Sequence, residues 1–154
     1  MLGKGTTELG SPKPQFGSLT ALTEGYCTVA YHVSKTQFAS LVERALRGLP
    51  AEFAAFLEEV PVEIRDRPSR RELSDLELED DELLLGLYRG RPRTQRSVED
   101  SGAMPDVIYI FQEDVELACD SEKELIEQVR TTVLHEIGHH FGMSEEDLDR
   151  LGYG

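Results

Sequence analysis

Apolar residues recur at helical spacing in the first half of the chain and predict a pair of helices. Over residues 34–49 they form one stripe, made of Phe38, Leu41, Val42, Ala45 and Leu46. Ser34 and Gln37 stand at the spacing of a capping box where this stripe begins. Gly48 interrupts the pattern, and Pro50 begins a shorter helix over residues 50–60, because the first helical position favours proline. We interpret both apolar faces as ordinary packing surfaces.

The strongest helical pattern lies near the end of the chain, over residues 121–141. Its apolar positions fill about half of a helical wheel, and they are Leu125, Ile126, Val129, Val133, Leu134, Ile137 and Phe141. Ser121 and Glu124 have capping-box spacing, and Gly142 is well placed to end the helix. This helix would be about 30 Å long and would bury one side.

Three shorter stretches have the character of strands. Residues 60–65 alternate between apolar and polar, while residues 83–90 and 107–111 are rich in aliphatic and aromatic side chains. A long polar connection separates the last two, and connections of that length in a compact domain are often functional. The acidic run over residues 72–82 is interpreted as a solvated connection with a helical turn.

The beginning of the chain lacks any such pattern. Residues 1–30 contain five glycines and two prolines without an apolar period, so they are predicted to form a flexible extension. Residues 31–154 are then expected to form one domain, which suits a chain of 154 residues.

Composition and charge narrow the possible partners. The net charge is −14, from 30 acidic and 16 basic residues, and such a surface disfavours nucleic acid and anionic membranes. It does not disfavour metal cations or cationic peptides. With only two cysteines and neither a secretory signal nor a membrane-spanning run, we expect a cytoplasmic protein with free thiols.

The sequence H-E-x-x-H on the long helix is the main candidate for chemistry. His135 and His139 lie outside the apolar arc and four residues apart, so both imidazoles can reach one ion. Zinc accepts neutral imidazole nitrogens and favours four ligands. Glu136 projects about 100° round the helix from His135, where it can act as general base on a water that the metal activates.

A catalytic zinc site needs a third protein ligand. Gly142 can adopt a positive φ and turn the chain back, so the side chain of Glu145 can return to the metal. Glu146 and Asp147 are alternatives, and all three also suit an acidic helix start. His140 points into the apolar arc and is interpreted as a core histidine with a hydrogen-bonded neighbour.

With these residues in view, the chain resembles the bacterial minimal zincins over roughly residues 34–153. The resemblance rests on "LLLGLYRGRP", on "RSV" with "PDVIYIF", and most specifically on "VLHEIGHHFGMSEEDLDRLGY". The family pattern, H-E-x-x-H-x-x-G-x-x followed by an acidic residue, matches His135, Glu136, His139, Gly142 and Glu145.

The resemblance implies both a fold and an activity. The fold would be compact α+β, with a small mixed sheet packed on the N-terminal helices and a long C-terminal active-site helix. An edge strand would be available to align an extended peptide. The activity would be that of a zinc metallopeptidase acting on peptides or unfolded proteins, with His135, His139 and Glu145 as metal ligands and Glu136 as general base.

Two other functions are compatible with parts of the pattern. A regulatory or interaction module could hold zinc without turnover in a fully ligated site. A compact metal-dependent endoribonuclease would use three histidines in H-x3-H-x5-H spacing, but position 145 is glutamate and the net charge opposes RNA binding. The metzincin pattern also has histidine where this chain has Glu145. The oligomeric state is left open.

Overall fold

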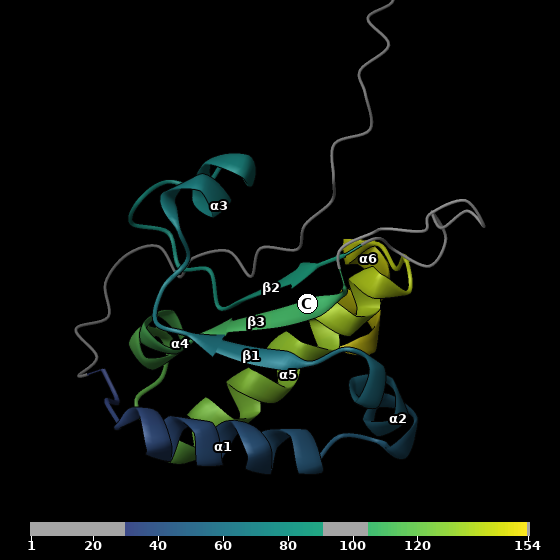
Figure 1. Cartoon of the computed structure of the whole chain (residues 1–154), viewed down its shortest axis with the longest axis horizontal. Helices are drawn as coiled ribbons and strands as arrows, with labels where there is room; N and C mark the ends of the chain where they lie inside the picture. The colour runs from purple at the N-terminus through teal and green to yellow at the C-terminus, as the bar shows by residue number, and fades with distance from the viewer. Residues whose placement is uncertain (1–29, 91–104, 154) are drawn as a thin grey trace, which may run out of the picture.

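The computed structural model describes residues 30–90 and 105–153 (Figure 1). The predicted extension over residues 1–30 lies outside this described part apart from its last residue. Most of the polar connection between the second and third strands lies outside it too.

The two predicted N-terminal helices are confirmed. Helix α1 spans Lys35–Arg47, and Ser34 and Gln37 form the predicted capping box at its start. Helix α2 spans Ala51–Glu59. Pro50 is the N-cap of α2 and not its first helical residue, because its ψ of 148° is still extended. The helix therefore begins one residue later than predicted.

Three short strands form a mixed sheet in the order β1-β3-β2. Strand β1 (Val62–Arg65) runs parallel to β3 (Val107–Phe111), and β2 (Gly86–Arg89) runs antiparallel to β3. Because helices and strands are combined around one small sheet, the α+β prediction is confirmed. Strand β2 is shorter than the predicted 83–90.

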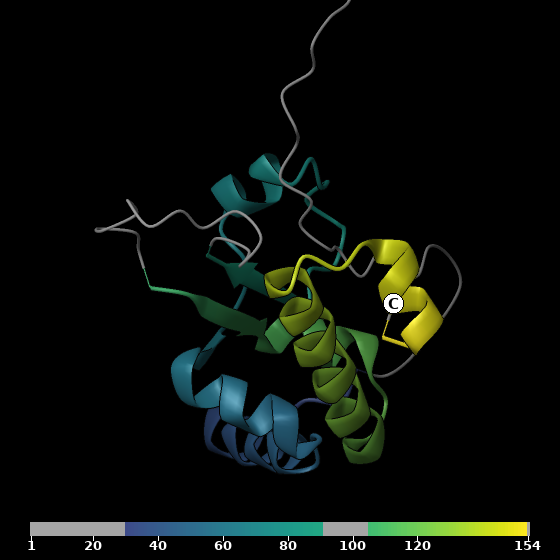
Figure 2. The same cartoon turned by 90° about the vertical axis from the view of Figure 1, so that its right-hand side faces the viewer.

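Helices cover the two faces of this sheet unequally. Helix α5 (Glu122–His140) crosses one face with α1 beside it, as Figures 1 and 2 show. Side chains from this face of the sheet, such as Ile108 and Ile110, join the main hydrophobic core. Phe111 and Leu87 point to the other face, where they pack with α3 (Arg70–Asp75) in a smaller apolar cluster.

Helix α4 (Gln112–Ala118) follows β3 without a connection and was not predicted. Its sequence lacks an apolar period because its buried positions include carboxylates. The Asp114 side chain accepts a hydrogen bond from the Leu84 N–H at 2.9 Å. Glu116 accepts one from His32 at 2.8 Å, so His32 ties the start of the described chain to α4.

The long C-terminal helix ends close to its predicted limits. At its start Ser121 accepts the Glu124 N–H, but the Glu124 carboxylate accepts the Asp120 N–H, so only half of the predicted capping box forms. Beyond Gly142 lies a short helix, α6 (Glu145–Leu151). None of the helices in residues 30–90 and 105–153 is both long and apolar enough to cross a bilayer.

Candidate metal centre

The second half of α5 is buried on all sides. Thr132, His135, Glu136, His139 and His140 are each at most 7% exposed. The sequence predicted a helix with one buried side, and this prediction is wrong for the last two turns. A helical wheel shows which side of α5 is apolar, but it cannot show that β2 and α6, from other parts of the chain, cover the polar side.

Two glycines bring α6 back against α5. Gly142 has a φ of 78°, a conformation that glycine adopts without steric cost, and its N–H donates to the His139 carbonyl at 2.9 Å. Gly138 faces Leu148, which is fully buried. A Cβ atom at position 138 would lie 2.3 Å from the Leu148 Cδ2 atom. The return of the chain therefore depends on the bend and on a helix surface without a side chain.

The return of α6 places three candidate ligand atoms in one cluster. The two imidazole Nε2 atoms of His135 and His139 are 2.9 Å apart. Glu145 Oε1 lies 3.3 Å from His139 Nε2, and Glu145 Oε2 lies 3.6 Å from His135 Nε2. Ligand atoms at 2.0–2.1 Å from a tetrahedral zinc ion would be about 3.3 Å apart. The donor set and its spacing therefore fit one zinc ion.

The other two candidates for the third ligand are not in this cluster. Among the described residues, only His135, His139 and Glu145 form a group of at least three His, Cys, Asp or Glu side chains close enough to share an ion. Asp147 instead accepts hydrogen bonds from the Ser144 hydroxyl at 2.8 Å and the Ser144 N–H at 3.2 Å. Its carboxylate therefore completes the capping box that Ser144 begins at the start of α6.

A backbone carbonyl fixes the orientation of the first imidazole. His135 Nδ1 lies 2.8 Å from the Tyr153 carbonyl oxygen. Because a carbonyl only accepts, Nδ1 carries the proton and Nε2 presents its lone pair to the cluster. Gly152, with a φ of 81°, ends α6 and lets the Tyr153 N–H bond the Leu148 carbonyl at 2.9 Å. The sequence did not predict this partner, because every residue has a backbone carbonyl and its position depends only on the fold.

The profile of the zincin-like metallopeptidase family matches residues 57–154, which include all the cluster residues. The chain belongs to the zincin-like metallopeptidase family. Membership implies a metal, typically zinc. No curated protein matches the chain.

In this zincin-like chain, burial shifts the pKa of His139 within the cluster and that of Glu136 beside it. Burial, with a smaller contribution from the neighbouring His135 imidazole, lowers the pKa of His139 to about 4, so the His139 imidazole is in the neutral form that metals bind. Burial raises the pKa of Glu136 to about 8, although the Tyr88 N–H donates to its Oε2 at 2.7 Å and favours the charged form. The nearby Glu145 carboxylate raises this pKa further.

The remaining histidine of the zincin-like motif belongs to the core, as predicted. His140 is 4% exposed, and its Nδ1 lies 2.7 Å from the Tyr88 hydroxyl. Its ring packs on Phe56, with 4.6 Å between ring centroids. Tyr88 therefore contacts Glu136 through its backbone and His140 through its side chain. Because residues four apart lie on the same side of a helix, both contacts tie β2 to one side of α5.

Proposed function

We propose that this protein is a zinc-dependent peptidase in which His135, His139 and Glu145 bind the ion. The observation that carries the proposal is the convergence of two imidazoles and a carboxylate beside the buried Glu136. A bound zinc ion supplies a Lewis acid that polarises the scissile carbonyl and acidifies a water molecule. The exposed Glu145 carboxylate, 51% accessible, leaves the cluster open to solvent on one side.

Glu136 acts as the general base in this proposal. It takes a proton from the attacking water and later gives it to the leaving amine. The Tyr88 N–H holds Oε2 of Glu136 in place at 2.7 Å. A raised pKa suits a group that must both accept and release a proton near neutral pH, and a cation close by would favour its charged form.

The substrate in this proposal is a peptide or an unfolded segment. Within the described residues β2 is an edge strand of the sheet, and its Tyr88 N–H donates a hydrogen bond to Glu136, the proposed base. The Tyr88 N–H of this edge is engaged by Glu136 and Gly86 is buried, so pairing of an extended substrate with β2 would require these groups to be released. The net charge of −14 disfavours RNA and favours cationic peptides over anionic ones.

Metal content and turnover together test the proposal. Purified protein is expected to hold one equivalent of zinc and to cleave peptides. Glu136→Gln should lower turnover by about 10²–10⁴-fold while zinc is retained, because the side chain is a base and not a ligand. The control is Glu127→Gln, the same change at an exposed position of the same helix.

Other outcomes would assign a different function. Bound zinc without turnover of any peptide would select the regulatory or interaction module. Cleavage of RNA that depends on Glu136 would select the endoribonuclease.

A further inference from the structure

One side of α5 carries three buried polar residues at a spacing of four. Thr132, Glu136 and His140 are each at most 4% exposed, and residues four apart lie one above another on a helix. His135 and His139 have the same spacing, but their Nε2 atoms face the metal cluster. Helix α5 therefore presents one row of polar side chains to the metal site and a second row beside it.

Strand β2 lies along this second row and contacts it at three successive turns. A Cβ atom at Gly86 would lie 2.4 Å from the Thr132 Cγ2 atom, so the strand approaches closely because residue 86 is glycine. The Tyr88 N–H donates to Glu136 Oε2 at 2.7 Å. The Tyr88 hydroxyl lies 2.7 Å from His140 Nδ1. Tyr88 thus bonds the proposed base through its backbone and the next turn of α5 through its side chain.

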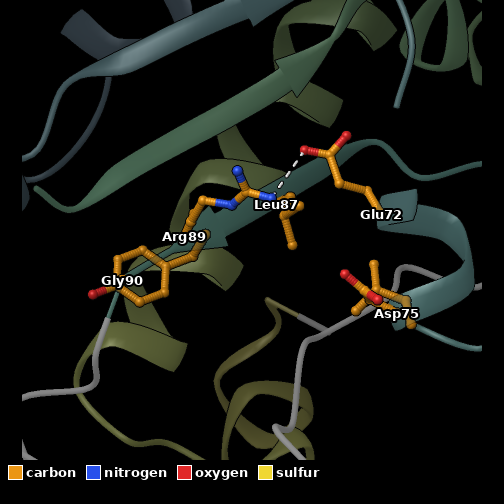
Figure 3. Close-up of a pocket in the computed structure, with 7 residues that line it drawn as sticks. Glu72, Asp75, Leu87, Arg89 and Gly90 are labelled. Atoms are coloured by element: carbon orange, nitrogen blue, oxygen red, sulfur yellow. Dashed lines mark ion pairs between the residues drawn. The ribbon is translucent and has the colours of Figure 1, made fainter. Parts of the chain in front are cut away.

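The opposite face of β2 is more loosely packed. A cavity of about 120 Å³ lies there between β2 and α3, and the residues that line it include Glu72, Leu87 and Arg89 (Figure 3). Atoms beside an empty space have fewer neighbours, so they hold a strand in place less firmly than close contacts do. The position of the Tyr88 N–H therefore depends on the ladder with β3 and on the contacts with α5.

The His140 ring provides a firm anchor for Tyr88. It packs against the Phe56 ring with 4.6 Å between centroids and meets the Tyr88 ring edge-on at 5.3 Å. Asp106 Oδ2 lies 3.8 Å from His140 Nδ1, beyond hydrogen-bonding distance, so the Tyr88 hydroxyl is the nearer of the two. An apolar side chain could fill the same space, but it could not fix the direction of Tyr88 through a buried hydrogen bond.

We propose that His140 and Tyr88 are positioning residues for Glu136: their side-chain hydrogen bond fixes β2 so that the Tyr88 N–H holds the carboxylate of the proposed base. The inference rests on the proposed peptidase function, and it gives His140 a role beyond filling the core. A general base works only when its oxygen lies within hydrogen-bonding reach of the proton that it takes. A displacement of about 1 Å can lower the rate by about 10²-fold.

Two replacements of similar shape at position 140 separate the hydrogen bond from the packing. His140→Asn keeps a polar atom near the place of Nδ1, whereas His140→Leu fills a similar volume without one. In zinc-loaded full-length protein, His140→Leu should lower kcat about 10–10²-fold relative to His140→Asn. The two variants should have equal KM and equal zinc affinity, because neither residue contacts substrate or metal in this proposal.

Changes at Tyr88 complete the test. Tyr88→Phe should lower kcat as much as His140→Leu does, and the two changes together should cost no more than either alone, because both remove one hydrogen bond. Tyr109→Phe is the matched control. It removes a hydroxyl from the neighbouring strand β3 on the face that packs away from α5, so kcat should stay at the wild-type value.

Hydrogen exchange tests the proposal without turnover and without metal. The chain has five tyrosines, so protein labelled with ¹⁵N only at tyrosine gives at most five amide signals, and the signal missing from Tyr88→Phe identifies Tyr88. In zinc-free protein, His140→Leu should speed exchange of the Tyr88 N–H about 2–10-fold, the factor that corresponds to one hydrogen bond. His140→Asn should leave this rate unchanged, and so should Tyr109→Phe.

The outcomes separate this inference from the proposed function. Equal loss of kcat in both His140 variants would assign the effect to ring packing and overturn the positioning role. A loss confined to KM or to zinc affinity would also overturn it, since it would concern binding and not the base. Peptide cleavage that depends on Glu136 but not on His140 would overturn this inference alone. No cleavage of any peptide by the wild type would overturn both proposals. Melting temperatures of the variants identify losses due to unfolding.

Discussion

Residue 138 is glycine, and the absence of a side chain there allows α6 to pack directly against α5. Leu148 is fully buried against Gly138, and α6 carries both Glu145 and the turn that presents the Tyr153 carbonyl. Gly138, between the two histidines of the motif, therefore shapes the candidate metal site by allowing helices α5 and α6 to approach closely.

Gly138→Ala is expected to weaken zinc binding and to destabilise the protein. The new Cβ atom would stand 2.3 Å from Leu148 Cδ2 and push α6 away. Loss of support for ligands typically lowers metal affinity by about 10–100-fold, and overpacking costs about 1–3 kcal/mol. Competition with a chromophoric chelator measures the affinity. Adding Leu148→Ala to this variant removes the clash and should restore part of the lost zinc affinity. A zinc affinity that Gly138→Ala leaves unchanged would contradict this explanation.

Three neighbouring acidic residues should differ in their effect on zinc. Glu145→Ala should reduce zinc affinity far more than Glu146→Ala, because only the Glu145 side chain joins the imidazole cluster. Asp147→Ala removes one half of the Ser144–Asp147 capping box and should lower the melting temperature slightly, with a smaller effect on zinc. Isothermal titration calorimetry measures the zinc affinity, and thermal unfolding measures the stability. Stronger zinc loss for Asp147→Ala than for Glu145→Ala would reverse the assignment.

At the scale of elements, α6 depends on its surroundings. Helices of seven residues are not stable alone in water. The Ser144–Asp147 capping box and the buried Leu148 side chain compensate within the fold. The third candidate ligand is thus carried by an element that only tertiary contacts stabilise.

Helix α4 depends on a buried carboxylate that binds the start of the described chain. Burial alone would raise the pKa of Glu116, but hydrogen bonds from Gln112, His32 and the Val33 N–H outweigh it and lower this pKa below its ordinary value. A lowered pKa in the folded state means that the charged form stabilises the fold above the unfolded-state pKa of about 4.3. This contribution is lost as the pH falls through the folded-state pKa.

Glu116→Gln should therefore reduce stability in a pH-dependent way. At pH 7 we expect the free energy of unfolding to fall by about 1.5–3 kcal/mol, the usual range for hydrogen bonds to a charged group. The difference from wild type should shrink as the pH falls below about 4, where wild-type Glu116 also becomes protonated. Urea unfolding of both proteins at a series of pH values measures this difference in the free energy of unfolding. Glu113→Gln, at an exposed position of the same helix, is the control; a difference constant with pH would contradict the expectation.

For the whole molecule, zinc should add stability without being required for folding. The main core joins α1, α5 and the sheet through side chains such as Phe38, Ile108 and Val133, none of which belongs to the group of His135, His139 and Glu145. Binding to the folded state alone stabilises by about 4 kcal/mol at a free ligand concentration of 1,000 times Kd. Chelation should lower the melting temperature but leave the helical circular dichroism at 25 °C largely unchanged. Collapse of that signal on chelation would show that folding depends on the metal.

Local periodicity was sufficient for the elements that bury an apolar face. Helix α1 and most of α5 were predicted because their apolar residues recur with the helical period. Strand β3 was predicted because it is a short run of aliphatic and aromatic residues. Helix α4 was missed because Asp114 and Glu116 occupy buried positions. Their partners, Leu84 and His32, are distant in sequence, and no local rule reveals such pairs.

By itself the sequence determined the spacing of the histidines, the position of Glu136 between them and the bend at Gly142. These are properties of one helix and its end, and they follow from covalent order and helical geometry. Only the tertiary structure decided the burial of the imidazoles, the choice of Glu145 over Asp147 in the cluster and the carbonyl that orients His135. Each of these depends on where α6 and β2 pack, which is set by contacts between residues far apart in the chain.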